Sequence, residues 1–556
     1  MRLSLWGCAV VFLVALPVGA QEPAATTPVL HVSSRLVVVD VTVTDSHGAP
    51  VHSLPKSAFR LTESGKGQVL ANVEEHTAPK KAVVASAPVL QPGVFSNVVS
   101  VAPDSSTPTI LLLDFVNIPL TSQGWVRAKL LDYLRNAPAN QRTAICVLNT
   151  KLVMLQNFTS DPALLLAALE RAKPQAAAMG NGDVERAFDK TQIPEEALDA
   201  YRENPAFTDI NEHQRADVSL QAFHQLALYL AGIPGRKNLI WFSAAFPLNL
   251  LPRWNRNRGD TNWEKEYRET VDLLARSRVA IYPVDARGIE TAPLVTSSRS
   301  RTAIDFSDVN VETQAAMMEM ADDTGGKAFL NTNGIAEAVA DVVAVGSDYY
   351  ALTYVPALGK ARDDYRAIHV DVDAPGGAKL SYRRGYYATP SDGAVEAAGK
   401  EEGVSTVQAA SSYLAPPATQ IPFFAHVVAT PASVVKVAEA QHQELAAAHN
   451  RRYDIEYSTE LRNLTVISTP EGLHTAHVEF LALAYDAQGR IVRSYSRPVH
   501  ITWTAEQFAA AEQHGARYQQ QISLPADGAT TLRLFIHDLA TNHIGSLDVP
   551  AAALKP

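Results

Sequence analysis

The chain of 556 residues lacks most of the features that mark a disulfide-rich, nucleic-acid-binding or membrane-spanning protein. Its two cysteines cannot build a disulfide framework. Its net charge is −10 and no basic block stands out, which argues against a nucleic-acid or anionic-membrane partner. Beyond the amino terminus, no segment is apolar over the ~20 residues that a membrane span requires. We expect a globular protein of roughly two to four domains.

Common catalytic motifs are also missing. No Gly-x-Ser-x-Gly elbow follows a strand, no His-Glu-x-x-His occurs, and no glycine-rich phosphate loop follows a strand. The sequence therefore predicts no enzyme and no catalytic residue. An unrecognised hydrolase stays open as an alternative, because acidic residues are abundant and no single pair stands out.

The amino terminus has the organisation of a secretory signal peptide. Arg2 supplies a positive charge, Leu3–Leu16 is apolar, and Val18–Ala20 provides small residues for cleavage before Gln21. We expect residues 1–20 to be removed and the protein to be exported, to the periplasm or outside the cell. Cys146 then remains, and a small buried apolar side chain is its expected role.

The middle of the chain alternates between strand-like and helix-like segments, which predicts an α/β fold with a mostly parallel, doubly wound sheet. The expected strands are 109–114, 143–149, 238–243, 279–285 and 327–330, and 153–158 interrupts the alternation. The expected helices are 125–136, 162–172, 219–230, 263–277, 311–324 and 335–345.

Period-two patterns on both sides of this region predict β structure. The expected organisation is a signal peptide at 1–20, an N-terminal β-rich segment at 30–80, the α/β domain at 107–357, a β extension at 358–390, a linker at 391–419 and a C-terminal β-sandwich at 420–556. The two β segments flanking the α/β domain are each too small for a core of their own, so we expect them to pack together.

Asp114 is the most informative residue, because it ends the apolar run Ile110–Leu113. A carboxylate at the carboxyl end of a buried parallel strand lies where α/β folds usually bind ligands. Whether Asp114 holds a metal or hydrogen-bonds its own loop decides the function predicted for this edge of the sheet.

Several stretches, in this order, resemble the von Willebrand factor A domain and in particular the related family of secreted bacterial proteins. They are Leu111–Asn117, Gly235–Ser243, Val279–Gly288, Thr324–Phe329 and Tyr349–Tyr354. The resemblance implies a divalent cation on the top of the sheet, bound through Asp-x-Ser-x-Ser, a threonine and a second aspartate.

The resemblance also shows how this chain departs from that site. Asp114 matches the first ligand, but Val116 and Ile118 replace the two serines, and Ser243-Ala244-Ala245 replaces Thr-Asp-Gly. The remaining oxygen-bearing candidates imply a degenerate metal site with a weakly held Mg²⁺ or Ca²⁺, or no ion. These candidates are Asp114, Asn117, Asp217, Ser219 and Ser243.

The sequence thus favours a non-catalytic protein-binding or adhesion module that uses the top face of the A-like domain. The expected ligand face consists of the loop 114–121, the insertion 180–218 and the loop 243–254. A scaffold subunit of a periplasmic complex is the alternative. The partner is expected to be a protein, with no nucleic acid and no membrane span after signal cleavage.

Overall fold

The computed structural model describes most of the chain, and Leu36–Pro556 forms one compact unit. The described residues are 36–77, 90–99, 106–138, 141–172, 205–244, 261–288, 302–356, 365–374, 377–387, 406–429, 450–469, 472–525 and 531–554. The expected signal peptide lies outside them. No helix within these segments has the length and apolar character needed to cross a bilayer.

A five-stranded sheet forms the centre of the α/β region. Its strands are β6 (Thr109–Asp114), β7 (Thr143–Leu148), β8 (Leu152–Thr159), β9 (Lys237–Ser243) and β10 (Val279–Asp285). They lie in the order β10-β9-β6-β7-β8. All neighbours are parallel except β7 and β8, which are antiparallel. The four parallel strands were predicted from sequence; the strand expected at 327–330 is reduced to a single parallel bridge from Phe329 to Val284.

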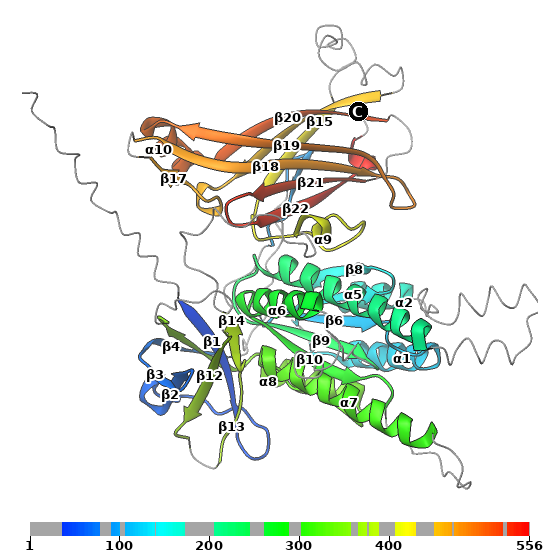
Figure 1. Cartoon of the computed structure of the whole chain (residues 1–556). Coiled ribbons are helices and arrows are strands. Elements are labelled where there is room, and N and C mark those ends of the chain that lie inside the picture. The colour runs from blue at the N-terminus through cyan, green and yellow to red at the C-terminus, as the bar shows by residue number, and fades with distance from the viewer. Residues whose placement is uncertain are drawn as a thin grey trace, which may run out of the picture. The chain divides into compact units, whose positions relative to one another are not determined.

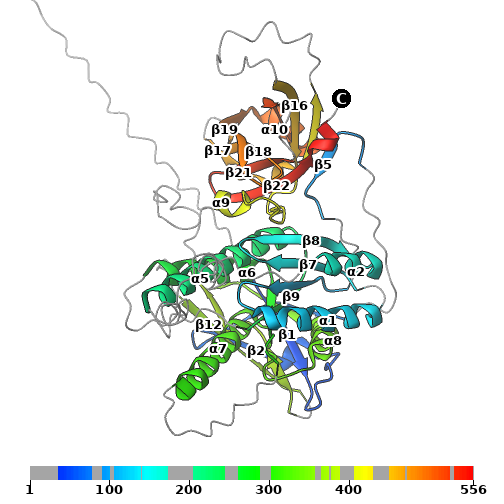
Figure 2. The same ribbon diagram turned by 90° about the vertical axis from the view of Figure 1, so that its right-hand side faces the viewer.

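Helices cover both faces of this sheet, because side chains alternate along each strand. Ile110 and Leu112 pack with α5, α6 and α7, whereas Leu111 and Leu113 pack with α1, α2 and α8. Figure 2 shows α5 and α6 on one side of the strands and α1 and α8 on the other. The helices are α1 (Leu120–Asn136), α2 (Pro162–Arg171), α5 (Pro205–Leu230), α6 (Thr261–Arg276), α7 (Thr302–Thr324) and α8 (Ile335–Gly346).

Three helices start earlier than the apolar periodicity indicated. Helix α1 begins at Leu120 after Pro119, whose φ of −53° suits a helix start. Helices α5 and α7 extend about two to four turns further toward the amino terminus than expected, through mostly polar sequence. Polar residues in a helix carry no periodic apolar signal, so sequence patterns miss them.

The β segments before and after the α/β region form one two-sheet unit, as expected (Figure 1). One sheet has the order β13-β1-β11-β4 and the other β14-β12-β2-β3. Strand β11 precedes residue 357, the expected end of the α/β domain, yet it pairs with β1 and β4. The strands are β1 (Val37–Thr44), β2 (Phe59–Glu63), β3 (Lys66–Gln68), β4 (Leu70–His76), β11 (Tyr349–Tyr354), β12 (Tyr365–Val372), β13 (Lys379–Ser381) and β14 (Gly385–Tyr387).

A buried carboxylate, Glu63, connects the two sheets of this N-terminal unit. It is 6% exposed and accepts hydrogen bonds from Tyr354 Oη at 2.7 Å, Tyr386 Oη at 3.1 Å and Arg366 Nη1 at 2.8 Å. Tyr354 belongs to β11, while the other partners belong to β12 and β14. The network therefore fixes the relative position of strands that are about 300 residues apart in the chain.

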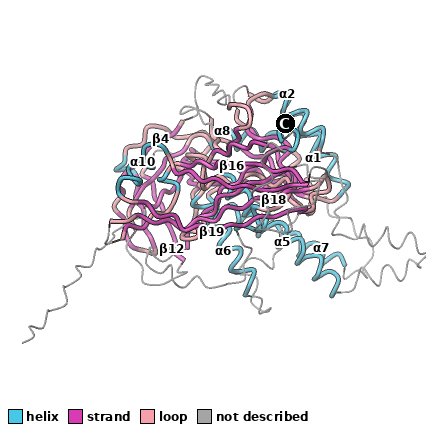
Figure 3. The backbone as a smooth tube through the Cα atoms, turned by 90° about the horizontal axis from the view of Figure 1, so that it is seen from above, coloured by secondary structure: helices cyan, strands magenta, loops and turns pink. Residues whose placement is uncertain are grey.

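The C-terminal part is a β-sandwich, as predicted. One sheet has the order β20-β16-β15-β5; in the other, β18 pairs with β17, β19 and β21, and β21 pairs with β22. Figure 3 shows β16, β18 and β19 lying along roughly the same axis, and β18 and β19 are antiparallel. The elements are β5 (Val94–Ser96), β15 (Phe424–Ala429), β16 (Asn450–Thr459), β17 (Ile467–Ser468), β18 (His474–Tyr485), β19 (Ile491–Trp503), α10 (Ala505–His514), β20 (Ala516–Pro525), β21 (Thr531–Asp538) and β22 (His543–Pro550).

Part of the segment expected to be a linker packs against this sandwich. Residues 406–418 include the short helix α9 (Thr406–Ala410). Arg533, 1% exposed, donates Nη1 to the carbonyls of Ala410 and Ser412 and Nη2 to that of Ala415, at 2.6–2.9 Å. It also pairs with Asp548. A buried guanidinium requires these acceptors, so Arg533 orders the segment.

We predict that Glu63→Ala lowers the free energy of unfolding by about 3–5 kcal/mol, because it leaves the buried Arg366 guanidinium and two tyrosine hydroxyls without their shared acceptor. Urea titration followed by circular dichroism measures the change. Glu74→Ala is the matched control, since Glu74 on β4 is 62% exposed, and it should change stability by less than about 0.5 kcal/mol. Equal losses in both variants would contradict the prediction.

Candidate functional site

Asp114 lies at the carboxyl end of β6, the central strand of the sheet, and is completely buried. Its side chain follows Ile110 and Leu112 on the face covered by α5, because side chains two residues apart share a face. On neighbouring β9, Trp241 and Ser243 lie on the same face. The parallel register pairs Trp241 with Leu112 and Phe242 with Leu113, so Ser243 lies level with Asp114. Strand register thus brings these three side chains together.

Four donors surround the Asp114 carboxylate. Oδ2 accepts hydrogen bonds from Asn117 Nδ2 at 2.8 Å, Trp241 Nε1 at 3.0 Å and Ser243 Oγ at 3.0 Å. Oδ1 accepts one from the Asn117 backbone N–H at 3.2 Å. Asn117 thus binds back to Asp114 within the loop, and Asp114 satisfies the hydrogen-bonding needs of its buried neighbours.

The sequence-predicted residues divide into two groups. Asn117 Nδ2 also approaches Ser219 Oγ at 3.2 Å, so Asp114, Asn117, Ser219 and Ser243 form one hydrogen-bonded cluster. Asp217 lies two residues before Ser219 on α5, about 200° around the helix axis. Its negative charge contributes to the raised pKa of Glu266 on α6. Asp217 is itself engaged in interactions.

Trp241 also belongs to this cluster, although it was not among the residues predicted from the sequence. It is buried, and its ring packs edge-on against Phe223 of α5. A buried tryptophan usually finds an acceptor for its N–H. Its spacing of two from Ser243 on a strand was the available signal that both face the same carboxylate.

Burial raises the pKa of Asp114, and the hydrogen bonds from Asn117, Ser243 and Trp241 offset part of that shift. Desolvation disfavours the ionised form, whereas N–H and O–H donors favour it. The buried carboxylate is thus energetically costly, and donors from its own loop and from β9 compensate its charge.

The chemistry of these donors does not fit a divalent cation. An indole N–H donates and cannot coordinate a metal, and Trp241 directs it at the oxygen that a cation would need. The Asn117 amide presents its NH₂ group, not its oxygen, to the same atom. Asp114 is the one carboxylate in the cluster, and Mg²⁺ requires near-octahedral oxygen coordination. No group of three or more His, Cys, Asp or Glu within the described segments is arranged to hold a metal.

A second aspartate, Asp285, ends β10 on the same edge of the sheet. It is 1% exposed and forms a two-point ion pair with Arg287, at 2.9 Å to Nε and 2.7 Å to Nη2. Gln314 Nε2 of α7 lies 3.5 Å from Asp285 Oδ2. Arg287 therefore braces Asp285, and this carboxylate is also engaged.

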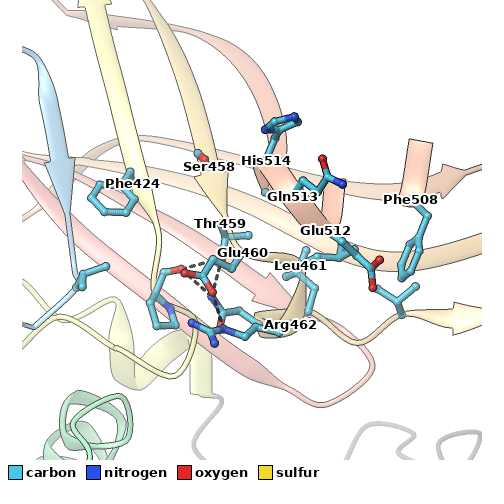
Figure 4. Close-up of a pocket in the computed structure, with 16 residues that line it drawn as sticks. Phe424, Ser458, Thr459, Glu460, Leu461, Arg462, Phe508, Glu512, Gln513 and His514 are labelled. Atoms are coloured by element: carbon cyan, nitrogen blue, oxygen red, sulfur yellow. Dashed lines mark hydrogen bonds and ion pairs between the residues drawn. The ribbon is translucent and has the colours of Figure 1, made fainter. Parts of the chain in front are cut away.

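The C-terminal sandwich carries an open pocket of about 740 Å³ beside α10, within the usual size of a ligand site. Its lining mixes apolar residues, such as Phe424 and Leu461, with an exposed ion pair between Glu460 and Arg462. In Figure 4, Phe424 and Phe508 lie on opposite sides of Glu460. The pocket can bind a ligand, but its lining presents no cluster typical of catalysis.

Two histidine contacts of the sandwich resemble parts of a catalytic triad. His537 contacts Glu479 at 3.1 Å through Nδ1, but Asn542 contacts its Nε2 at 2.8 Å, where a nucleophile would have to stand. Ser468 contacts His474 Nδ1 at 3.0 Å on an exposed hairpin. Neither arrangement has the geometry of nucleophile, base and orienting acid.

Comparison with known proteins gives limited additional information. No protein-family model matches the chain, and no curated protein does. Solved structures similar to it include an aerotolerance-related membrane protein from Bacteroides fragilis, with 14% identity, a TM-score of 0.24, and coverage of 43% of this chain and 99% of that one. Another is a von Willebrand factor type A protein from Catenulispora acidiphila, with 8% identity, coverage of 65% and 76%, and a TM-score of 0.25.

Proximal thread matrix protein 1 from the mussel byssus is a further neighbour, with 10% identity and a TM-score of 0.23. The match covers 45% of this chain and 49% of that protein, so it spans about half of that neighbour's length. TM-scores this low support no conclusion about fold or function. What the chain does must be argued from its own geometry.

We predict that Asp114→Asn changes the pH dependence of stability. The pKa of Asp114 is higher in the folded protein than its ordinary value of 3.8, so the folded state binds this proton more tightly. Its contribution to stability is therefore largest at low pH and falls as pH rises from 3.8 through the folded pKa. Asparagine cannot ionise.

The stability of Asp114→Asn relative to wild type should therefore increase with pH above 3.8 and then level off. Urea unfolding over about pH 4 to 8 measures this difference. Asp132→Asn, at a carboxylate that is 61% exposed, serves as the control and should give a nearly flat difference. A flat difference for Asp114→Asn as well would contradict the prediction.

We also predict that Mg²⁺, Ca²⁺ and Mn²⁺ do not bind at Asp114, because a cation would have to displace the Trp241, Asn117 and Ser243 donors. Calorimetric titration of the purified protein should give no binding heat, and the melting temperature should stay unchanged. A binding heat that disappears in Asp114→Ala would show that the loop rearranges around a metal. Heat retained in that variant would indicate a site elsewhere.

Proposed function

We propose that the chain is an exported, non-catalytic protein-binding module, acting as an adhesin or as a scaffold subunit. Its partner contacts the carboxyl edge of a doubly wound, von Willebrand factor A-like sheet, and no cation bridges the two proteins. The compartment is the periplasm or the cell exterior, because residues 1–20 have the composition of a signal peptide.

One observation carries this proposal: the Asp114 loop keeps the position of an A-type ligand site while its carboxylate is fully hydrogen-bonded from within. The sheet order, with β6 between β7 and β9 and an antiparallel β8 at the edge, supports the A-like assignment. Open α/β sheets bind ligands at the carboxyl ends of their strands. A pre-ordered loop there favours binding over chemistry.

The surface beside Asp114 suits a protein partner. Leu120 begins α1 directly after the buried loop and is 54% exposed, an unusual place for a large apolar side chain. Pro119 next to it is also exposed. The other parts of the expected ligand face, residues 180–204 and 245–254, lie outside the described residues. Leu120 is therefore the position from which the proposal can be tested.

We predict that a photoreactive p-benzoylphenylalanine at position 120 forms a discrete protein adduct in native cells. The matched control is position 164 in α2, where Leu164 is 47% exposed. It lies at the opposite edge of the sheet, because antiparallel β8 returns the chain there before α2 begins. Gel electrophoresis and mass spectrometry of the adducts measure the result.

The expected outcome is one adduct from position 120 and none from position 164, with a yield that is unchanged by a chelator. The same adducts from both positions, or none from position 120, would contradict binding at this edge. An adduct that requires a divalent cation would support the edge but reject the metal-independent mode.

A further inference from the structure

Cationic side chains accumulate at the amino edge of the A-like sheet, the edge opposite Asp114. Arg236 and Lys237 precede and begin β9, Arg278 precedes β10, and Arg383 approaches from the turn before β14. Arg236 and Lys237 are 3% and 2% exposed. The carboxylate facing them is Asp40 of β1, which is 9% exposed.

Asp40 compensates one of these charges directly. Arg278 pairs with both of its oxygens, through Nε at 3.0 Å and through Nη2. Two other carboxylates act on the cluster from farther away: Asp272 on Arg383 and Glu74 on Arg278. Asp272 is already ion-paired with Arg276, and Glu74 is 62% exposed. More positive than negative charge is therefore buried here.

The remaining cations are held by neutral oxygens. Arg236 donates Nη2 to Tyr282 Oη at 3.0 Å and to the Gly325 carbonyl at 2.8 Å, and Arg383 donates Nη2 to the Val38 carbonyl at 2.9 Å. Lys237 Nζ donates to the Ile233 carbonyl at 2.6 Å. Burial and the charge of Arg278 lower the pKa of Lys237 to about 7, consistent with a positive environment.

In this cationic cluster, two buried donors have no acceptor among the described residues: the Nε–H groups of Arg236 and Arg383. Both residues line one small cavity of about 20 Å³, together with Asp40, Arg278 and Thr324. A cavity of this size holds a single water-sized particle, since about 10–15 Å³ is enough for one. An unpaired guanidinium N–H in such a place needs an acceptor.

We propose that this cavity binds a small monovalent anion of the size of chloride, held by the guanidinium groups of Arg236 and Arg383. A water would accept the same hydrogen bonds but leave the surplus positive charge uncompensated, and burying charge without compensation is costly. The carboxylate of Asp40 also faces the cavity, but Arg278 engages both of its oxygens and screens them from the anion. A phosphate or an organic acid is too large for this space.

The anion has a structural consequence. Arg383 contacts the backbone of β1, while Arg236 contacts the backbone after α7 and the side chain of Tyr282 on β10. An ion shared by both residues therefore connects the N-terminal β unit to the amino edge of the A-like sheet. Chloride should stabilise this junction, because it binds the folded state alone.

The test compares thermal unfolding of the purified protein in sodium chloride, bromide and gluconate at a constant ionic strength of about 0.15 M. We expect the melting temperature to rise saturably by about 3 °C as chloride replaces gluconate, and bromide to act like chloride. Arg383→Gln should abolish this difference. Arg462→Gln, at an arginine that is 80% exposed, is the control and should retain it.

Equal melting temperatures in chloride and gluconate would overturn the proposal, and so would an anion effect that persists in Arg383→Gln. If Arg383→Gln does not fold, crystals of the wild-type protein grown in bromide decide the question. An anomalous peak within hydrogen-bonding distance of the Arg236 and Arg383 Nε atoms supports the site. No peak there rejects it.

Discussion

A carboxylate that is removed from water must be surrounded by donors, and this requirement governs the junctions of the described structure. Glu63 joins the two N-terminal sheets through two tyrosines and an arginine. Asp40 joins β1 to the five-stranded α/β sheet through Arg278. Asp114 joins β6 to β9 through Trp241 and Ser243. Removing the donors from any of these sets leaves a buried carboxylate uncompensated. Each set therefore fixes one arrangement of its neighbours.

The same requirement explains what the Asp114 loop can and cannot do. A carboxylate that coordinates a metal must keep lone pairs free for it, with further oxygens around the ion. Here Val116 and Ile118 are buried against the sheet and offer no oxygen, and N–H groups of Trp241 and Asn117 take the lone pairs. The hydrogen bonds of Asp114 are therefore satisfied without an ion, and the proposed partner contact rests on exposed positions such as Leu120.

Sequence patterns predicted the parallel strands well, because a buried strand must be apolar along its whole length. Local spacing and the family resemblance also singled out Asp114, Asn117, Asp217, Ser219 and Ser243, but as oxygen ligands of a weakly held metal; four of them are joined by hydrogen bonds. They missed Trp241, because membership there depends on the register between β6 and β9. They missed the order in residues 406–418 for a similar reason: the determining residue, Arg533, is more than 100 residues away.

The two edges of the five-stranded sheet show how one principle gives opposite results. At the carboxyl edge, one negative charge meets four donors, and the set is closed. At the amino edge, cations outnumber the carboxylates that face them, and two arginines that line one small cavity each have an Nε–H group with no protein acceptor among the described residues. A charged group whose hydrogen bonds are all satisfied by the protein does not need an ion. A group of like charges with unpaired donors is stabilised by an ion of the opposite charge. The charge balance therefore favours an anion at the junction with the N-terminal unit over a cation at the proposed binding edge.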